Sequence, residues 1–369
     1  MNYIYLDNAA TTKQHPLVTA EINRVSQELF YNAAALYTPS LSVKQHIEQA
    51  RKIILNKLSM TGEGELVFTS GATESNNMVI LGKASKHGKI LLLEGEHSSA
   101  HTPAKFLGDN GYDVEMIPLD KLGRADLSKL KTAPNIGSSV TLVFGLVNSD
   151  TGTIQDAKSI VQAVRAMSPN AHIHCDATQA FCKIPFDVES LGFDSVAISA
   201  HKIGGPKGIG ALWIKKGVNI KQLMFGGGQQ ALRPGTENNP GVAGFAKAVE
   251  VFDTNTNWKN VSQLHTHLVT NLPKDCTING INNNPYITNI GLPNNIMGQT
   301  AMNALATDGI LVGLGSACAS NASKNRTLVA MGIQDQKTKQ VLRISFSPDN
   351  TIADVDIFIK KLKETLAKL

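Results

Sequence analysis

The stretch Ser199-Ala200-His201-Lys202 combines residue types that do chemistry, and a glycine- and proline-rich segment, 203–208, follows it directly. The preceding residues, 193–198, are largely apolar and contain no glycine or proline, which is typical of a buried strand. A lysine at the end of such a strand suits Schiff-base chemistry, because burial or nearby cations lower its pKa until the neutral amine attacks a carbonyl. An ordinary exposed loop lysine would look the same in isolation, so the assignment depends on the other motifs.

A second polar group alternates along His172-Ile173-His174-Cys175-Asp176. On a strand, His172, His174 and Asp176 share one face, as metal ligands do, but no companion cluster has familiar zinc spacing. A carboxylate at a strand end is also what a pyridoxal phosphate site needs, because the ion pair keeps the pyridine nitrogen protonated and makes the ring an electron sink. Asp176 and Lys202 end neighbouring predicted strands, so both could face one ring.

Other polar residues also follow predicted strands. His97 comes after strand 90–93, where it could stack on a flat cofactor or move protons, although a lone histidine is more often structural. Asn148 follows the strand 140–147. The stretch 70–73, Ser-Gly-Ala-Thr, separates a strand from a helix, and it fits either an anion site at a helix N-terminus or a plain N-cap by Thr73. Together these positions point to one crevice.

Two residues nearer the C-terminal end carry further chemistry. Cys318 lies among small residues in a probable loop, and small neighbours leave a thiol accessible. Arg343 interrupts an otherwise apolar strand, which is costly without an anionic partner, so we expect it to bind a substrate carboxylate. Core positions are the simpler explanation for the other cysteines, Cys175, Cys182 and Cys276.

These residues need a framework, and the hydrophobic pattern predicts one. The candidate strands are 66–68, 90–93, 114–117, 140–147, 172–175, 196–199 and 210–214, and the candidate helices are 42–58, 74–84, 154–167 and 242–252. Alternating strands and helices favour an α/β fold with a mainly parallel sheet between helices. We expect a large domain over 13–254 and a smaller α+β domain from 1–12 and 255–369, because composition shifts to Asn, Thr and Pro after 255.

Composition narrows the functional class. The 369 residues are 42% hydrophobic and 18% charged, and the net charge of +5 comes without a long Lys/Arg block, so nucleic-acid binding is not indicated. The four cysteines are too scattered for a disulfide framework, and the N-terminus lacks the features of a signal peptide. No stretch approaches the length of a membrane span. We therefore expect a cytoplasmic protein with reduced thiols.

Taken together, the motifs resemble those of the cysteine desulfurases, the NifS/IscS-like branch of the fold-type I pyridoxal phosphate enzymes in the class V aminotransferase group. The resemblance rests on shared order and spacing almost from end to end. Its motifs are Tyr5-Leu6-Asp7-Asn8-Ala9-Ala10-Thr11-Thr12, Ser70-Gly71-Ala72-Thr73-Glu74-Ser75-Asn76, Glu96-His97, His174-Cys175-Asp176-Ala177-Thr178-Gln179, Ser199-Ala200-His201-Lys202, Arg233-Pro234-Gly235-Thr236, Gly315-Ser316-Ala317-Cys318 and Arg343.

The resemblance implies a role for each matched residue. Lys202 would bind pyridoxal 5′-phosphate covalently and move the α-proton, and Cys318 would attack the sulfur of L-cysteine, giving L-alanine and a persulfide. His97 would stack on the ring and take part in proton transfer. Asn148 and Arg343 would bind the substrate. Further cofactor contacts would come from Asp176 at the ring nitrogen, Gln179 at the ring hydroxyl, Thr73, Ser199 and His201 at the phosphate, and Thr236 of the other subunit in a homodimer.

The resemblance also implies an acceptor protein, in iron–sulfur cluster assembly or tRNA thiolation, and no metal. Two segments depart from the family pattern. Residues 32–37 lack the usual Pro and His, and residues 319–327 lack the usual Leu-Glu-Pro-Ser motif. The nearest alternative function is that of a selenocysteine lyase or another β-elimination lyase. A second alternative is a non-catalytic protein that serves as a sulfur-assembly partner. A penicillin-binding hydrolase with Ser199-x-x-Lys202 lacks its Lys-Thr-Gly element, because Ala133 follows Lys131-Thr132.

Overall fold

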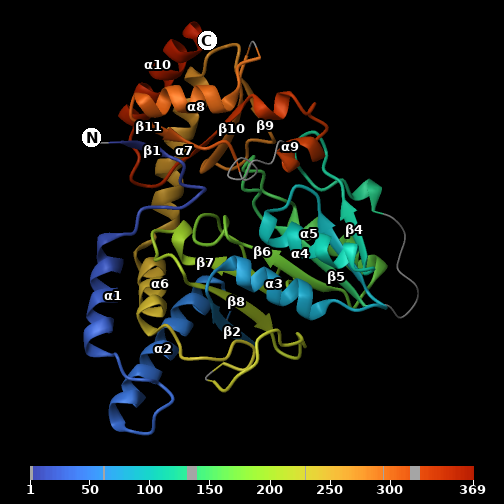
Figure 1. Ribbon diagram of the computed structural model, residues 1–369, viewed down its shortest axis with the longest axis vertical. Helices are drawn as coiled ribbons and strands as arrows, with labels where there is room; N and C mark the ends of the chain where they lie inside the picture. Colours follow the sequence, from blue (N-terminus) through green and yellow to red (C-terminus); the bar gives the residue numbers. More distant parts are fainter. Residues whose placement is uncertain (1–2, 61–62, 131–138, 229, 294, 316–324) are drawn as a thin grey trace.

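The computed structural model describes residues 3–60, 63–130, 139–228, 230–293, 295–315 and 325–369 (Figure 1). Its centre is a seven-stranded sheet in the order β2-β8-β7-β6-β5-β3-β4. The strands are β2 (Gly64–Thr69), β3 (Lys89–Leu93), β4 (Asp113–Ile117), β5 (Val140–Gly145), β6 (His172–Asp176), β7 (Ser195–Ser199) and β8 (Gly210–Lys215).

The predicted α/β fold with a mainly parallel sheet is confirmed. The strands β4, β3, β5, β6 and β7 run parallel to their neighbours, whereas β8 pairs antiparallel with both β2 and β7. Parallel strands present their carboxyl ends at one edge of a sheet, which is where ligands bind in open α/β folds. The predicted strand positions therefore place the polar residues that follow them along one edge.

Helices cover both faces of this sheet, as the alternation of side chains along β3 shows. Ile90 and Leu92 join one apolar cluster with α3 and α4, and Leu91 and Leu93 belong to the main core on the other face. The helices of this part are α1 (Pro16–Glu28), α2 (Thr38–Lys57), α3 (Ala72–Lys83), α4 (Ser98–Asp109), α5 (Ala157–Met167) and α6 (Asn239–Val251), with the short η1 (Leu127–Lys129) and η2 (Ala200–Lys202).

Helices α1 and α4 were not among the predicted elements. Helix α4 contains Pro103 and begins with two serines, and both features weaken a helical signal in sequence. Helix α2 starts at Thr38 rather than at the predicted residue 42, with Pro39 in its first turn, where a missing N–H does no harm.

The two ends of the chain meet above the large sheet (Figure 1). The strand β1 (Ile4–Leu6) pairs parallel with β11 (Ile310–Val312), and a three-stranded sheet has the order β12-β10-β9. The remaining elements are β9 (Thr277–Asn279), β10 (Ile287–Gly291), β12 (Val341–Ser345), α7 (Thr254–Asn271), α8 (Gly298–Thr307), α9 (Arg326–Ala330), α10 (Ile352–Lys368) and η3 (Lys337–Lys339).

The domain boundaries at residues 12 and 254 remain a prediction. Within the described residues, every helix is too short or too polar to span a bilayer.

Candidate active site

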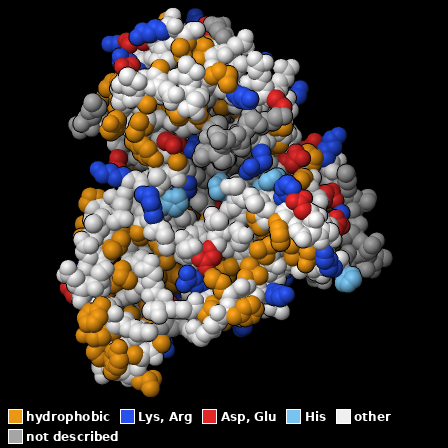
Figure 2. Space-filling view, viewed as in Figure 1, with side chains coloured by type: hydrophobic (Ala, Val, Ile, Leu, Met, Phe, Trp, Pro, Cys, Tyr) orange, Lys and Arg blue, Asp and Glu red, His pale blue; other side chains and the backbone are white. Residues whose placement is uncertain are grey.

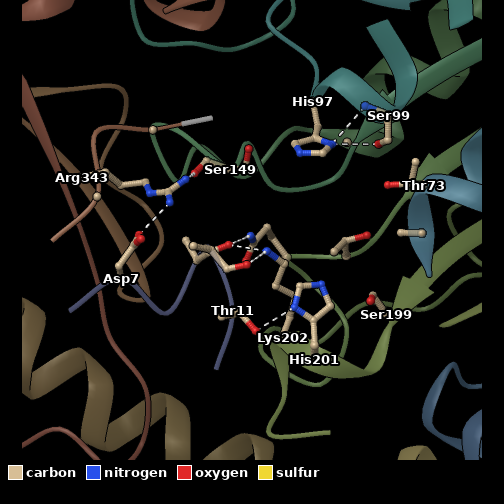
Figure 3. Close-up of a pocket in the computed structure, with 18 of the residues that line it drawn as sticks. Asp7, Thr11, Thr73, His97, Ser99, Ser149, Ser199, His201, Lys202 and Arg343 are labelled. Carbon is tan, nitrogen blue, oxygen red and sulfur yellow. Dashed lines mark hydrogen bonds and ion pairs between the residues drawn. The ribbon is translucent and has the colours of Figure 1, made fainter. Parts of the chain in front are cut away.

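One cavity of about 850 Å³ lies where the carboxyl ends of the parallel strands meet the residues after β1 (Figure 3). It brings together residues that are far apart in the sequence. Of the predicted site residues, the cavity is lined by Thr73, His97, Asn148, Asp176, Gln179, Ser199, His201, Lys202 and Arg343. Asp176 and Lys202 follow the neighbouring strands β6 and β7, as expected, because these strands pair in parallel with Asp176 opposite Ala197.

Lys202 ends the single turn η2 directly after β7, so a rigid strand sets its position. Its Nζ donates to the backbone carbonyls of Ala9 and Ala10, in the second case over 2.8 Å. Burial, reinforced by the positive charge of Arg343, lowers the pKa of Lys202 to about 8. A neutral, nucleophilic amine is therefore available near physiological pH.

Asp176 presents a fixed carboxylate at the end of β6. Its Oδ1 accepts a hydrogen bond from the backbone N–H of Thr178 over 2.9 Å, and its Oδ2 accepts one from Asn76 Nδ2 over 2.7 Å. Each oxygen keeps a further lone pair, because a carboxylate oxygen accepts two hydrogen bonds. This geometry suits a second cationic or N–H donor, such as a protonated pyridine nitrogen.

His97 caps the N-terminus of α4 and lies beside Ser99 (Figure 3). Its Nδ1 accepts the backbone N–H of Ser99 over 3.2 Å and lies 2.9 Å from Ser99 Oγ. Desolvation in the cavity lowers the pKa of His97 below its ordinary value. The ring is therefore neutral at physiological pH, with its proton on Nε2.

The N-terminus of α3 provides an anion site. Gly71 is the N-cap and contributes no side-chain hydrogen bond, so the first N–H groups of α3 stay available to a ligand. Thr73 lies inside the helix, and the alternative of a plain N-cap by Thr73 is therefore wrong. Ser199 and His201 lie nearby, and His201 Nδ1 is 3.1 Å from Thr11 Oγ1 (Figure 3). Burial, with the charge of Lys202, lowers the pKa of His201 to about 4.

Arg343 occupies the opposite side of the cavity (Figure 3). Its Nη2 pairs with Asp7 Oδ1 over 2.8 Å, and its Nη1 donates to the Ser149 carbonyl over 2.9 Å. Arg343 Nε is buried without a partner in the described part of the chain. Asn148 Oδ1 accepts the backbone N–H groups of Asp150 and Thr151, which holds the turn after β5 against this arginine.

Sequence reasoning missed two charged residues beside the site. Asp7 is the carboxylate that pairs with Arg343. The sequence could have indicated such a partner, because an arginine in an apolar strand needs a nearby anion. Lys183 is only 3% exposed, and its Nζ donates to Gln179 Oε1 over 3.1 Å. The Nε2 of Gln179 donates to the Ala9 carbonyl, so Lys183 orients the amide expected to contact a cofactor. A lysine inside an apolar run gave no sign of this contact.

Among the described residues, one predicted site residue lies away from the cavity, and a second predicted residue falls outside the described part of the chain. Thr236 is exposed on the surface of this chain. Cys318 lies outside the described residues, although Gly315, before that gap, lines the cavity, and a Cβ built on Gly315 would lie 2.8 Å from the side chain of Asn325, after the gap. The expected core positions of Cys175 and Cys182 are confirmed, and Cys276 is half-buried.

The alternating histidines of β6 do not form a metal centre. His172 Nε2 and His174 Nδ1 each lie 2.8 Å from Ser195 Oγ. Across the described ranges, no group of three or more His, Cys, Asp or Glu side chains is placed to hold a metal ion.

Comparison with known proteins decides the family. The model of the family described as "Aminotransferase class-V" matches residues 4–358. The chain belongs to this family. Within the family it groups with the cysteine desulfurases: it is 33% identical to "Cysteine desulfurase IscS 1" of Archaeoglobus fulgidus, over 99% of this chain and 97% of the relative. The relative from Methanosarcina thermophila, "Cysteine desulfurase IscS", is also 33% identical, over 99% and 92%.

Solved structures agree with this placement. A structure titled "NIFS-LIKE PROTEIN" superposes with a TM-score of 0.90 at 31% identity and covers 100% of both chains. A second, "SspA in complex with cysteine", has a TM-score of 0.81 at 28% identity and covers 94% of this chain and 99% of its own. The resemblance seen in the sequence motifs is therefore confirmed.

Members of this cysteine desulfurase family depend on pyridoxal 5′-phosphate, and the cavity fits that cofactor. An amine, a carboxylate and an uncapped helix N-terminus line the same cavity and match its aldehyde, ring nitrogen and phosphate. In addition, Thr178 is one of the residues that line the cavity, and its Oγ1 is buried without a hydrogen-bond partner in the described chain. A buried hydroxyl of this kind is expected where a polar ligand completes the site.

Proposed function

We propose that this chain is a homodimeric L-cysteine desulfurase that gives L-alanine and a persulfide on Cys318. The observation that supports this most is the convergence of Lys202, Asp176, His97 and Arg343 on one cavity. The relatives named cysteine desulfurase and the neighbour in complex with cysteine support the same substrate.

The residues of the chain divide the work between them. Bound pyridoxal 5′-phosphate supplies an electron sink that acidifies the α-proton of an amino acid. Lys202 binds the cofactor and, with its lowered pKa of about 8, takes up and returns the α-proton at Nζ. Asp176 would accept the N–H of the ring, and His97 would contact the ring. Arg343 would bind the substrate carboxylate, because its guanidinium group carries a positive charge in the wall of the cavity.

Cys318 receives the sulfur in this proposal. Its thiolate attacks the substrate sulfur, an S–S bond forms, and the C–S bond breaks with its electron pair left on the carbon skeleton, which takes up protons and leaves as L-alanine. One L-cysteine and one protein thiol thus become one L-alanine and one persulfide. The segment that carries Cys318 begins after Gly315, which lines the cavity, and this supports the assignment.

The test measures alanine and sulfide from L-cysteine with a thiol reductant. We expect Lys202→Ala to lose both the visible absorption band of the bound cofactor and activity. Cys318→Ala should keep the absorption band and lose activity. If Cys318→Ala releases sulfur at the natural rate, the persulfide step is wrong and a β-elimination lyase, acting on cysteine or selenocysteine, becomes the better assignment.

A second copy of this chain completes the site in this proposal. Hydrophobic side chains gather over the connection between α1 and α2, where Phe30, Leu36 and Leu41 are 67%, 99% and 54% exposed (Figure 2). Exposed apolar patches of this kind mark protein contacts. Thr236 is exposed and outside the cavity of its own chain, which supports its proposed contact with the phosphate of the other subunit.

The persulfide sulfur then passes to an acceptor protein, in iron–sulfur cluster assembly or tRNA thiolation. We infer a cytoplasmic location, because a persulfide carrier depends on reduced thiols. Transfer of ³⁵S from labelled cysteine to a candidate acceptor protein, with Cys318→Ala as the control, tests the proposed sulfur transfer. Transfer that persists in Cys318→Ala would contradict it.

A further inference from the structure

A chain of buried polar side chains runs from the cavity into the large sheet, and the proposed reaction does not use it. Asn76 on α3 lies at its centre, with its Nδ2 2.7 Å from Asp176 Oδ2 and 2.9 Å from Ser99 Oγ. Its Oδ1 lies 2.9 Å from His174 Nε2. The chain continues from His174 Nδ1 to Ser195 Oγ and on to His172 Nε2, over 2.8 Å in each step.

Each proton in this chain has a determined place. A carboxylate only accepts, so Asn76 must turn its NH₂ towards Asp176, and its Oδ1 then accepts a proton held on His174 Nε2. In neutral His174, Nδ1 then carries no proton, and it accepts a hydrogen bond from the Ser195 hydroxyl. Ser195 Oγ is left to accept from His172 Nε2. All of these hydrogen bonds therefore point towards Asp176.

Burial keeps this chain neutral and rigid. Asn76, His174 and Ser195 are 0% exposed, and His172 is 5% exposed. Burial lowers the pKa of His174 to about 4 and the pKa of His172 well below its ordinary value, so neither imidazole takes a second proton at physiological pH. A charged His174 would donate from Nδ1 as well, which would reverse its hydrogen bond with Ser195 Oγ.

The second N–H of Asn76 extends the network to His97. Asn76 Nδ2 donates to Ser99 Oγ, and the Ser99 hydroxyl then has His97 Nδ1 within reach as its acceptor (Figure 3). The backbone N–H of Ser99 also donates to this nitrogen. Both donors leave the proton of His97 on Nε2. One amide thus contacts the carboxylate on one side and, through Ser99, the imidazole on the other.

We propose that Asn76, held by the hydrogen-bonded series His174–Ser195–His172, is a positioning residue that sets the orientation of Asp176 and, through the Ser99 hydroxyl, helps to hold the ring of His97. This rests on the proposed cofactor roles of Asp176 and His97. Asn76 touches neither substrate nor reacting atoms, and it acts by holding the two groups that do.

The first test needs neither cofactor nor variant. In the cofactor-free protein labelled with ¹⁵N-histidine, long-range ¹H–¹⁵N NMR reports the tautomer of each ring. We expect His172 and His174 to carry the proton on Nε2 with no change between pH 6 and pH 8, and His97 to carry its proton on Nε2 at pH 8. A proton on Nδ1 of His174 would overturn the proposal, whatever the reaction of the enzyme.

The second test measures the dissociation constant for pyridoxal phosphate. His174→Phe leaves the buried Asn76 Oδ1 without a donor, so the amide is no longer held towards Asp176, and we expect binding of pyridoxal phosphate to weaken by about tenfold or more. In His174→Gln the side-chain amide can donate to Asn76, and we expect affinity within about threefold of the natural protein on the same scale. Asn76→Leu should match His174→Phe in affinity and leave the proton of His97 on Nε2, because the backbone N–H of Ser99 still donates to Nδ1.

The matched control is Asn77→Ala, since Asn77 lies on the same helix but its Nδ2 donates to the backbone carbonyls of Thr73 and, over 3.4 Å, Ser99, and to neither Asp176 nor the Ser99 hydroxyl. We expect its affinity to be unchanged. Equal affinity for His174→Phe and His174→Gln would show that the hydrogen bond from His174 to Asn76 does not affect cofactor binding. That result would contradict the proposal. Because both histidine variants keep Lys202 and Cys318, a failure here is separate from a failure of the proposed desulfurase reaction.

Discussion

Two lysines with different roles lie close to the cavity, Lys202 half-buried and Lys183 buried. Lys202 follows a strand and donates to backbone carbonyls, whereas Lys183 lies behind Gln179 and holds its amide. Burial is the largest cause of a lowered pKa for both residues, to about 8 for Lys202 and about 7 for Lys183. The proximity of positive charges, Arg343 among them, lowers both values further.

The lowered pKa of Lys202 predicts an unusual pH dependence of its reactivity. In the cofactor-free protein, acetylation of Lys202 by acetic anhydride should rise with a midpoint near pH 8, well below the ordinary lysine value of 10.5. Competitive labelling with mass spectrometry measures this against exposed lysines of the same sample. Arg343→Gln should move the midpoint upward, and a midpoint above pH 10 in the natural protein would contradict the prediction.

The buried charge of Lys183 predicts how stability depends on pH. Its pKa is lowered to about 7 in the folded protein from 10.5, so between pH 7 and 10.5 the unfolded chain binds the extra proton. Stability therefore rises with pH in that window, by about 1.4 kcal/mol per pH unit, and this contribution is absent in Lys183→Met.

Urea unfolding of the cofactor-free natural protein and Lys183→Met at pH 7 and pH 9 checks this. The difference in unfolding free energy should shift in favour of the natural protein at pH 9. A difference that does not change with pH would mean that Lys183 keeps an ordinary pKa in the fold.

Among the elements, the junction of β2, α3 and β8 matters most for the anion site. Gly210 begins β8 beside Gly71, the N-cap of α3. A Cβ on Gly210 would lie 2.6 Å from the Ile198 carbonyl oxygen and 2.7 Å from Gly71 Cα. Both are backbone atoms with little freedom to move, so close packing here sets where the helix N-terminus points.

Gly210→Ala should therefore lower stability by about 1–3 kcal/mol, as overpacking does, and weaken binding of pyridoxal phosphate by displacing α3. Thermal unfolding and a cofactor titration measure the two effects. Gly108→Ala is the control, because its Cβ meets only Val114 at 3.9 Å and alanine favours a helix. If both variants bind the cofactor equally well, the position of α3 does not depend on this contact.

At the scale of the whole molecule, the proposed homodimer shares its sites between subunits. Lys202 belongs to one chain and Thr236 to the other in each proposed site. A mixed dimer of Lys202→Ala and Thr236→Ala then contains one site with both residues intact. If Thr236 served its own chain, no intact site would form.

Co-refolding the two variants in equal amounts should restore about a quarter of the natural sites, since about half of the dimers are mixed and each has one intact site of two. Alanine production against each variant alone measures this gain. A mixture no more active than the sum of its parts would contradict sharing. A parallel sedimentation experiment on Leu36→Glu with Phe30→Glu shows whether the exposed patch forms the dimer contact.

The sequence by itself determined the class of fold and nine of the residues that line the cavity. Polar residues directly after apolar strands can be recognised from local pattern alone, and the parallel sheet places them at one edge. This explains why Lys202, Asp176, His97 and Asn148 were predicted and do line one cavity. Motif order along the chain was enough for the family.

Only the tertiary structure decided how these residues are held. Asp7 meets Arg343 through the pairing of strands from the two chain ends, and Asn76 meets Asp176 across packed elements. Lys183 reaches Gln179 inside the core. Such contacts depend on which elements pack together, and periodicity along one element does not report its neighbours. The histidines of β6 show this best, because their shared face was evident while their partners, Asn76 and Ser195, were not.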